Sequence, residues 1–268
     1  MKKTLLLLIL ISSVHLASSQ NAQTGIIYYD HIDNHYDESY NAYLVFEPTT
    51  AHFVTAKDSL GLSDGSKVQN QNAGAELIIE AVNFSDVQKT RKQGLQVYMN
   101  KRTDSMYSSN AFSLTAGLLY TKESLPKLQW QLSNDTKQIG KFQCLKATTT
   151  FRGRTYTCWY TTQIPLPYGP WKLQGLPGMI LEASSNDRFV QFIFKGIEFP
   201  VQHVQVPSTH KILLTKEQDF ISFTQYKKLQ KEDIQAYDNA MKVQGKKFGI
   251  TVHPFSERDN YLEVFGDQ

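Results

Sequence analysis

The chain has 268 residues, of which 41% are hydrophobic. It therefore carries enough apolar material for a core, and disorder over most of its length is excluded. Its 28 lysines and arginines include Lys2 and Lys3, and without these two, 26 basic residues face 25 acidic ones. Basic clusters are interleaved with acids or glutamines, which argues against a nucleic-acid partner, because such partners require a concentrated basic face.

The N-terminus has the pattern of a secretory signal. Lys2 and Lys3 precede an apolar run from Leu5 to Ile11, and small residues follow at positions 17–19. The run is shorter than the about 20 residues that span a bilayer core. We therefore predict a signal peptide over residues 1–19, cleaved after Ser19. One domain over residues 20–268, exported and without a transmembrane span, is expected to follow.

Most of the remaining chain is typical of short strands separated by polar or glycine-containing turns. In chain order, the predicted strands are 25–31, 42–47, 51–57, 76–83, 95–100, 105–112, 118–122, 140–151, 155–161, 179–184 and 189–199. Several are apolar on both faces, as from Ile26 to Tyr29. Such a strand needs cover on both sides of the sheet, or on one side with a ligand or partner on the other.

Helical periodicity is confined to the C-terminal part. Thr215 followed by Gln218 forms a capping box, and Gly245 is a natural helix stop. We predict one helix over residues 216–243, and leave open a break near Lys231. Because strands and helices do not alternate, we predict a mostly β fold. Its leading form is an antiparallel, strongly curved sheet or flattened barrel with the C-terminal helical segment packed against it, and a two-sheet sandwich is the alternative.

The two cysteines, Cys144 and Cys158, flank a predicted hairpin turn at Arg152 and Gly153. A two-residue loop would place Cys158 opposite Ala147 and leave the two cysteines on opposite faces. A three-residue loop would place them on one face but out of register. A disulfide needs Cα atoms within about 7 Å, so we predict two unpaired thiols.

Two motifs offer chemistry but have simpler explanations. The stretch Gly61-Leu62-Ser63-Asp64-Gly65 matches a nucleophile elbow, and His203, His210 and His253 follow it. The polar loop after it lacks helical periodicity, and the same residues suit an ordinary turn. A hydrolase with an unrecognised site therefore remains an alternative function, and no catalytic residue is predicted.

The second motif is a dense group of potential metal ligands: Asp30, His31, Asp33, His35, Asp37 and Glu38. Histidine with carboxylate suits zinc or another transition metal, and carboxylates alone suit calcium. The group lies between two predicted strands, where an acidic hairpin loop needs no ion. We predict no metal or cofactor, and a metal-binding protein that uses the loop from His31 to Glu38 is an alternative.

The segment from Trp159 to Glu182 contains four of the nine prolines and two of the three tryptophans. Pro177-Gly178 suits the centre of a type II turn, in which glycine adopts positive φ. We expect a stiff crossover that folds back over the hairpin of residues 140–161. A packing clamp that closes one end of the core is favoured, and a recognition surface for a peptide or partner protein is the alternative. The candidate binding residues are Trp159, Trp171, Gly175, Leu176, Pro177, Gly178 and Met179.

The same region carries a family resemblance. Its motifs are Lys146-Ala147-Thr148, Phe151-Arg152-Gly153-Arg154, Trp159-Tyr160-Thr161, Ile164-Pro165, Gly169-Pro170-Trp171-Lys172 and Gly175-Leu176-Pro177-Gly178-Met179-Ile180. Between about residues 137 and 182 the chain resembles the GLPGLI family of Bacteroidota, with Met179 in place of a leucine. The resemblance implies an exported envelope protein of the periplasm or outer membrane. It implies no activity and no catalytic residue.

The sequence thus favours a non-enzymatic binding or accessory protein of the periplasm or outer membrane. Its expected partner is a periplasmic or outer-membrane protein.

Overall fold

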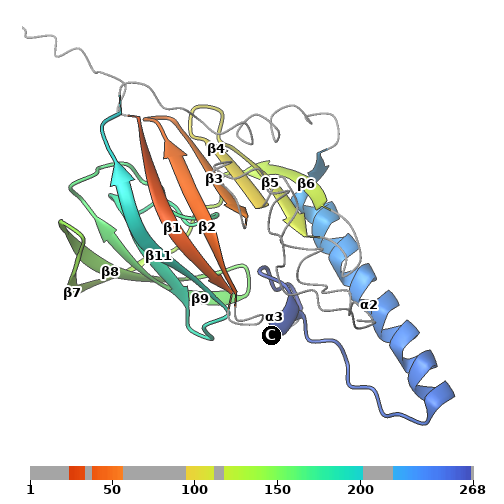
Figure 1. Ribbon diagram of the computed structural model, residues 1–268. Coiled ribbons are helices and arrows are strands. Elements are labelled where there is room, and N and C mark those ends of the chain that lie inside the picture. The colour runs from red at the N-terminus through yellow and green to blue at the C-terminus, as the bar shows by residue number, and fades with distance from the viewer. Residues whose placement is uncertain (1–23, 34–37, 57–94, 112–117, 202–219, 267–268) are drawn as a thin grey trace, which may run out of the picture.

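The computed structural model describes residues 24–33, 38–56, 95–111, 118–201 and 220–266. Within these ranges the chain forms one twelve-stranded sheet and two helices (Figure 1). The strands are β1 (Gly25–Asp33), β2 (Glu38–Phe46), β3 (Thr50–Ala56), β4 (Leu95–Asn100), β5 (Ser105–Ala111), β6 (Leu118–Ser124), β7 (Gln131–Ile139), β8 (Phe142–Phe151), β9 (Arg154–Thr161), β10 (Met179–Ser185), β11 (Val190–Glu198) and β12 (Ile221–Ser222). The helices are α2 (Phe223–Phe248) and α3 (Glu257–Asn260).

The strand order is β12-β6-β5-β4-β3-β2-β1-β11-β10-β9-β8-β7, and the sheet is not closed into a barrel. Neighbouring strands are antiparallel throughout, apart from the parallel pair of β12 and β6. The sheet curves strongly, so that β8 and β9 lie behind β1 and β11 in the view of Figure 1. The predicted fold, a mostly antiparallel curved sheet with a C-terminal helix, is confirmed.

The main core fills the inner face of the curved sheet. It joins strands from both ends of the order, because Leu44 and Met99 belong to the same buried cluster as Cys158 and Ile180. The Tyr29 hydroxyl crosses this core and donates a hydrogen bond of 2.7 Å to the carbonyl of Ile180. Curvature therefore lets one sheet enclose a core that would otherwise need two.

A smaller apolar cluster lies on the opposite, outer face of the sheet. It consists of Ile26, Tyr43, Val45 and Val54, with Tyr28 packed against it. Ile27 and Tyr29 point into the main core instead, because successive side chains alternate along a strand. The strand from Ile26 to Tyr29 therefore carries buried apolar side chains on both faces of the sheet, in agreement with its doubly apolar pattern.

Helix α2 differs from its prediction at both ends. Its N-cap is Ser222, whose hydroxyl accepts a hydrogen bond of 3.1 Å from the backbone N–H of Gln225. The predicted capping box at Thr215 lies outside the described residues. The helix continues through Lys231 without a break and passes Gly245, which is buried, before it ends at Gly249 with φ of 64°. Among the described residues, no helix combines the length and apolar character needed to cross a bilayer.

The hairpin of β8 and β9 has the two-residue loop. Phe151 pairs with Arg154, and both loop residues have positive φ, 51° for Arg152 and 74° for Gly153, as in a type I′ turn. This register places Cys158 opposite Ala147. Cys144 and Cys158 are both buried and free, so the prediction of unpaired thiols is confirmed.

Strand β7 was missed by the sequence pattern. All its side chains are exposed or half-buried except that of Ile139, and its pairing with β8 shifts between Leu132 and Thr136. A polar, irregular strand at the end of a sheet shows no apolar alternation, so no periodicity marks it. The signal peptide and the strand predicted at 76–83 lie outside the described residues.

Candidate functional site

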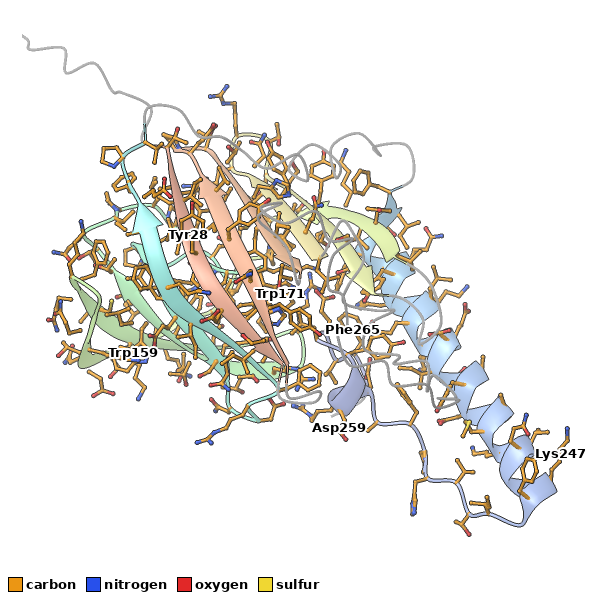
Figure 2. All side chains as sticks on the ribbon, in the orientation of Figure 1. Tyr28, Trp159, Trp171, Lys247, Asp259 and Phe265 are labelled. Carbon is orange, nitrogen blue, oxygen red and sulfur yellow. The ribbon has the colours of Figure 1, made fainter. Side chains whose placement is uncertain are left out.

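The crossover of residues 162–178 between β9 and β10 packs inside the curved sheet. Trp171, Leu173 and Leu176 all belong to the main core cluster, and Figure 2 shows Trp171 near the centre of the molecule. The indole of Trp171 contacts the rings of Phe151 and Tyr156, with centroids 5.7 and 5.9 Å apart. These rings belong to β8 and β9, so the crossover does fold back over that hairpin, as the sequence indicated.

The seven candidate binding residues separate by exposure. The side chains of Trp171, Leu176 and Met179 are buried, and Trp159 is half-buried on β9. Gly175 and Pro177 reach the surface, whereas Gly178 does not. The crossover therefore acts first as a packing element. A binding role for these residues stays a prediction.

The turn at Pro177-Gly178 is not the expected type II turn. Gly175 has φ of 95°, but Gly178 has no positive φ. Glycine is needed at 178 for another reason, because a Cβ there would lie 2.2 Å from the carbonyl oxygen of Thr161. The backbone of the crossover thus passes too close to the end of β9 for any side chain.

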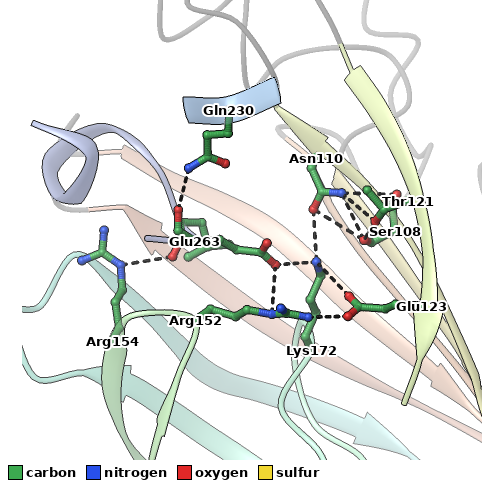
Figure 3. A network of polar contacts seen from close by, with 10 residues as sticks. Ser108, Asn110, Thr121, Glu123, Arg152, Arg154, Lys172, Gln230 and Glu263 are labelled. Carbon is green, nitrogen blue, oxygen red and sulfur yellow. Dashed lines mark hydrogen bonds and ion pairs between the residues drawn. The ribbon is translucent and has the colours of Figure 1, made fainter. Parts of the chain in front are cut away.

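Lys172, directly after Trp171, is fully buried and begins a cluster of charged groups (Figure 3). Its ammonium group pairs with the carboxylate of Glu263 and donates a hydrogen bond of 3.2 Å to Oδ1 of Asn110. A carboxylate oxygen of Glu123 lies 3.9 Å away. We call Glu123, Arg152, Lys172 and Glu263 the ion cluster; it joins β6, the β8–β9 turn, the crossover and the C-terminal segment.

Arg152 completes the cluster. Its guanidinium donates a hydrogen bond of 2.5 Å to Glu123 and lies 3.4 Å above the ring of Phe223 at the start of α2. Its Nε is 3.9 Å from Glu263. Burial raises the pKa of the Glu123 carboxyl above its ordinary value, while the charges of Lys172 and Arg152 act in the opposite direction. Two cations thus face two carboxylates, and the cluster is neutral when all four groups are ionised.

A second arginine of the same turn holds the C-terminal segment. Arg154 is fully buried; it forms an ion pair with Asp187 and donates to the backbone carbonyls of Arg258, Tyr261 and Leu262. The segment also passes tightly over the turn, because a Cβ on Gly153 would lie 2.4 Å from the carbonyl oxygen of Val264. Three of the four cationic residues of the resemblance motifs, Arg152, Arg154 and Lys172, therefore converge on residues 257–265, whereas Lys146 pairs with Asp135.

The sequence pattern did not single out the ion cluster. Lys172 and Glu263 are 91 positions apart, and nothing local marks a lone glutamate as a buried partner. The available signal was the placement of two arginines and a lysine within otherwise apolar motifs, since such side chains are rarely buried unless they are paired. Chemically, the cluster is suited to fastening segments together, because its charges already face one another.

A different feature lies on the outer face, across β3, β4, β5 and β6. Val45 pairs with His52, His52 with Tyr98, Tyr98 with Tyr107, and Tyr107 with Lys122. Directly opposed residues point to the same face. Val45 belongs to the outer cluster, so these side chains also lie on the outer face.

Aromatic rings in this row contact one another. Tyr107 lies 6.2 Å from Tyr98 and 5.1 Å from Phe220, and Phe220 lies 6.1 Å from Tyr120, all measured between ring centroids. All four rings are half-buried. We call Tyr98, Tyr107, Tyr120 and Phe220 the aromatic strip. The rings are tilted or edge-to-face to one another, with interplanar angles of 48°, 70° and 84°, and three of the four carry a phenol hydroxyl.

The two motifs with potential chemistry are described only in part. Asp30 and His31 lie on β1 and point to opposite faces, since Asp30 pairs with Lys195 at 3.0 Å while His31 stacks on Phe192 in the core at 4.8 Å. His35 and Asp37 lie outside the described residues. Within the described ranges, no three histidines, cysteines or carboxylates are grouped as metal ligands. Ser63, His203 and His210 also lie outside them, so the elbow prediction is not examined by the structure.

The chain is similar to part of a known family of proteins, both in sequence and in fold. Residues 75–205 match the model of the N-glycanase peptide N-terminal domain, which is just under half of the chain. No curated protein matches the sequence. Two solved structures of PNGF-II, in the C2 and P21 space groups, are similar to the fold, with TM-scores of 0.50 and 0.51 at 13% sequence identity. Each similarity covers 80% of this chain and 34% of the PNGF-II chain, so this chain corresponds to about a third of that protein.

Proposed function

We propose that this protein is an exported, non-catalytic binding protein that holds a carbohydrate on the aromatic strip. The main observation behind this proposal is that Tyr98 contacts Tyr107 and Tyr107 contacts Phe220. These half-buried rings therefore lie side by side on one face of the sheet. A sheet is a rigid support, so the rings are held in a fixed geometry before a ligand arrives, which lowers the entropy cost of binding.

The chemistry of the strip suits a sugar ring. One face of a pyranose presents C–H groups that pack against an aromatic ring, while its hydroxyl groups hydrogen bond at the edges. Tyrosine offers both an apolar ring and a polar tip. Tyr98 and Tyr107 supply two such tips, and the Lys122 ammonium lies 5.1 Å from the ring centroid of Tyr107. A ligand site is usually lined by apolar groups with a small number of polar groups among them.

The comparisons support a glycan as the ligand class. The matching family model is the N-terminal domain of an N-glycanase, a name that refers to N-linked glycans. The chain corresponds to only part of PNGF-II, which fits a domain that binds rather than one that carries the whole protein's activity. The similarity to the N-glycanase domain thus supports a glycan as the ligand, and the aromatic strip supports the position of the binding site.

Export and cellular location belong to the same proposal. The N-terminal pattern and the resemblance to the GLPGLI family support an envelope protein of a Bacteroidota cell, with a glycoprotein of the periplasm or outer membrane as its partner. N-terminal sequencing of the protein recovered from the envelope fraction should start at Gln20. Protein that keeps Met1 and stays in the cytoplasm would refute export.

Binding is tested by calorimetry of the purified protein with oligosaccharides released from envelope glycoproteins. We expect Tyr107→Ala and Tyr98→Ala each to weaken binding at least tenfold while costing only about 1 kcal/mol of stability, as for other half-buried aromatic side chains. The matched control is Tyr237→Ala, a tyrosine 38% exposed on α2 and away from the strip. Unchanged affinity in both strip variants, or no binding of any oligosaccharide by the natural chain, would show the proposal to be wrong.

A further inference from the structure

The far end of α2 carries exposed apolar side chains. Val243, Phe248 and Ile250 are 55%, 72% and 64% exposed, and they are three of the six exposed large hydrophobic residues in the part of the chain that the structure describes. Figure 1 shows the helix projecting away from the sheet, and Figure 2 labels Lys247 at its distant end. None of the three side chains belongs to either apolar cluster of the sheet, so core packing does not account for them.

Local structure fixes these side chains in the exposed position. The helix ends in a Schellman turn, in which Gly249 has φ of 64° and the N–H of Ile250 donates to the carbonyl of Gly245 at 2.9 Å. The returning chain packs on Gly245 through Val252. Phe248 and Ile250 therefore flank a hydrogen-bonded turn, and most of each side chain is exposed.

The charge around the turn has one sign. Residues 239–256 contain no aspartate or glutamate, but they include Lys242, Lys246 and Lys247, all exposed. Two of these lysines stabilise the helix end through the helix dipole. The dipole gives no reason for the apolar residues beside them. Apolar side chains surrounded by lysines are the pattern of a surface that meets an anionic interface.

We propose that this helix tip, made of Val243, Lys246, Lys247, Phe248 and Ile250, docks on a bilayer surface that contains anionic phospholipid. Phe248 and Ile250 enter the headgroup region, and the lysines contact the lipid phosphates. A bilayer is favoured over an acidic protein because the tip protrudes, and a fluid surface admits a protruding tip without a matching pocket. A second copy is disfavoured because two tips of like charge repel each other.

The test is co-sedimentation of the full mature chain with vesicles. One set is phosphatidylcholine alone, and the other is equal parts of phosphatidylcholine and phosphatidylglycerol. We expect binding to the anionic vesicles only, weakened by added salt because exposed charges are screened. The double variant Phe248→Ser with Ile250→Ser should bind at least tenfold more weakly, as should Lys246→Gln with Lys247→Gln.

Matched controls separate the tip from general surface effects. Leu132→Ser changes a side chain that is 62% exposed on β7, at the opposite end of the sheet order from α2. Lys227→Gln with Lys228→Gln removes two exposed lysines at the start of the same helix. Both should bind like the natural chain. Equal binding to the two kinds of vesicle, or tip variants that bind as tightly as these controls, would overturn the proposal. So would a dimer in analytical ultracentrifugation that the tip variants convert to monomer.

Discussion

Lys172 in the crossover and Glu263 near the C-terminus form an ion pair in which the lysine side chain is fully buried and that of Glu263 is only 4% exposed. Glu123 and Arg152 lie within 3.9 Å of one or the other member. The pair therefore links two parts of the chain that share no strand pairing. The contribution of this pair to the stability of the fold depends on the balance of all four charges in the ion cluster, because a buried charge without a partner is costly.

The first prediction concerns that balance. Lys172→Met leaves two carboxylates facing one guanidinium, and it should lower the free energy of unfolding by about 3–5 kcal/mol in urea titrations. Adding Glu263→Gln restores one carboxylate to one guanidinium, so the double variant should lose less than the two single losses combined. Lys146→Met, in an exposed pair with Asp135 at 3.0 Å, serves as control and should cost less than about 1 kcal/mol. Additive losses would contradict a coupled cluster.

The second prediction concerns the close approach at Gly178. Gly178→Ala should destabilise the protein by about 1–3 kcal/mol, because its Cβ would overlap the carbonyl of Thr161 and force the crossover away from β9. Gly196→Ala on β11 is the matched control, since a Cβ there meets nothing within 4 Å. It should change stability by less than about 0.5 kcal/mol. Equal melting temperatures for the two variants would refute the steric explanation.

The third prediction compares two tryptophans. Trp171→Ala removes a side chain that is only 4% exposed, and it should cost about 3–5 kcal/mol of stability, with a melting temperature many degrees lower. Trp159→Ala, half-buried beside Lys137, should cost about 1 kcal/mol. If Trp171→Ala instead left the melting temperature unchanged while abolishing capture of an envelope partner, the crossover would be a recognition surface.

The fourth prediction concerns pH. Burial raises the pKa of Glu123 in the folded chain above its unfolded value, which is about 4.3. Between these two pKa values the folded state binds more protons, so this group makes the protein more stable as pH falls through that window. Glu123→Gln removes the titration. The natural chain should therefore gain stability relative to the variant on acidification from neutral pH, as measured by denaturant titration at several pH values.

A pH-independent difference would show that Glu123 has its ordinary pKa in the folded state. Asp187 behaves in the opposite sense, because its lowered pKa gives stability that is lost as pH falls. Asp187 is present in both proteins, so its contribution cancels in the comparison.

The sequence predicted the elements that local patterns encode and missed those that depend on distant contacts. Alternation of apolar side chains located the inner strands, such as β9 and β10, to within a residue or two. Strand β7 escaped because its side chains are polar, and the start of α2 was misplaced because a capping box was preferred over Ser222. The ion cluster could not be predicted, because Glu123 and Glu263 become partners of Lys172 only in the folded chain.

Gly178 in the crossover also shows that sequence patterns do not reveal contacts between distant residues. Pro177-Gly178 has the composition of a type II turn, and composition alone supports positive φ. The structure shows that the constraint comes from Thr161, a residue on another element, and acts through space rather than through the local backbone. Local rules identified the need for glycine but assigned it to the wrong cause.

Strand β7 has a consequence for how the molecule behaves among its copies. Among the described strands it is the last of the sheet, and an edge strand can recruit a strand from another chain. Here that edge has an irregular pairing around Leu132 to Thr136 and exposed charges at Asp135 and Lys137. A strand approaching from a neighbouring molecule would have to match a bent backbone and desolvate those charges. The polar residues of β7, which left no apolar alternation in the sequence, thus disfavour edge-to-edge assembly of the protein into fibres.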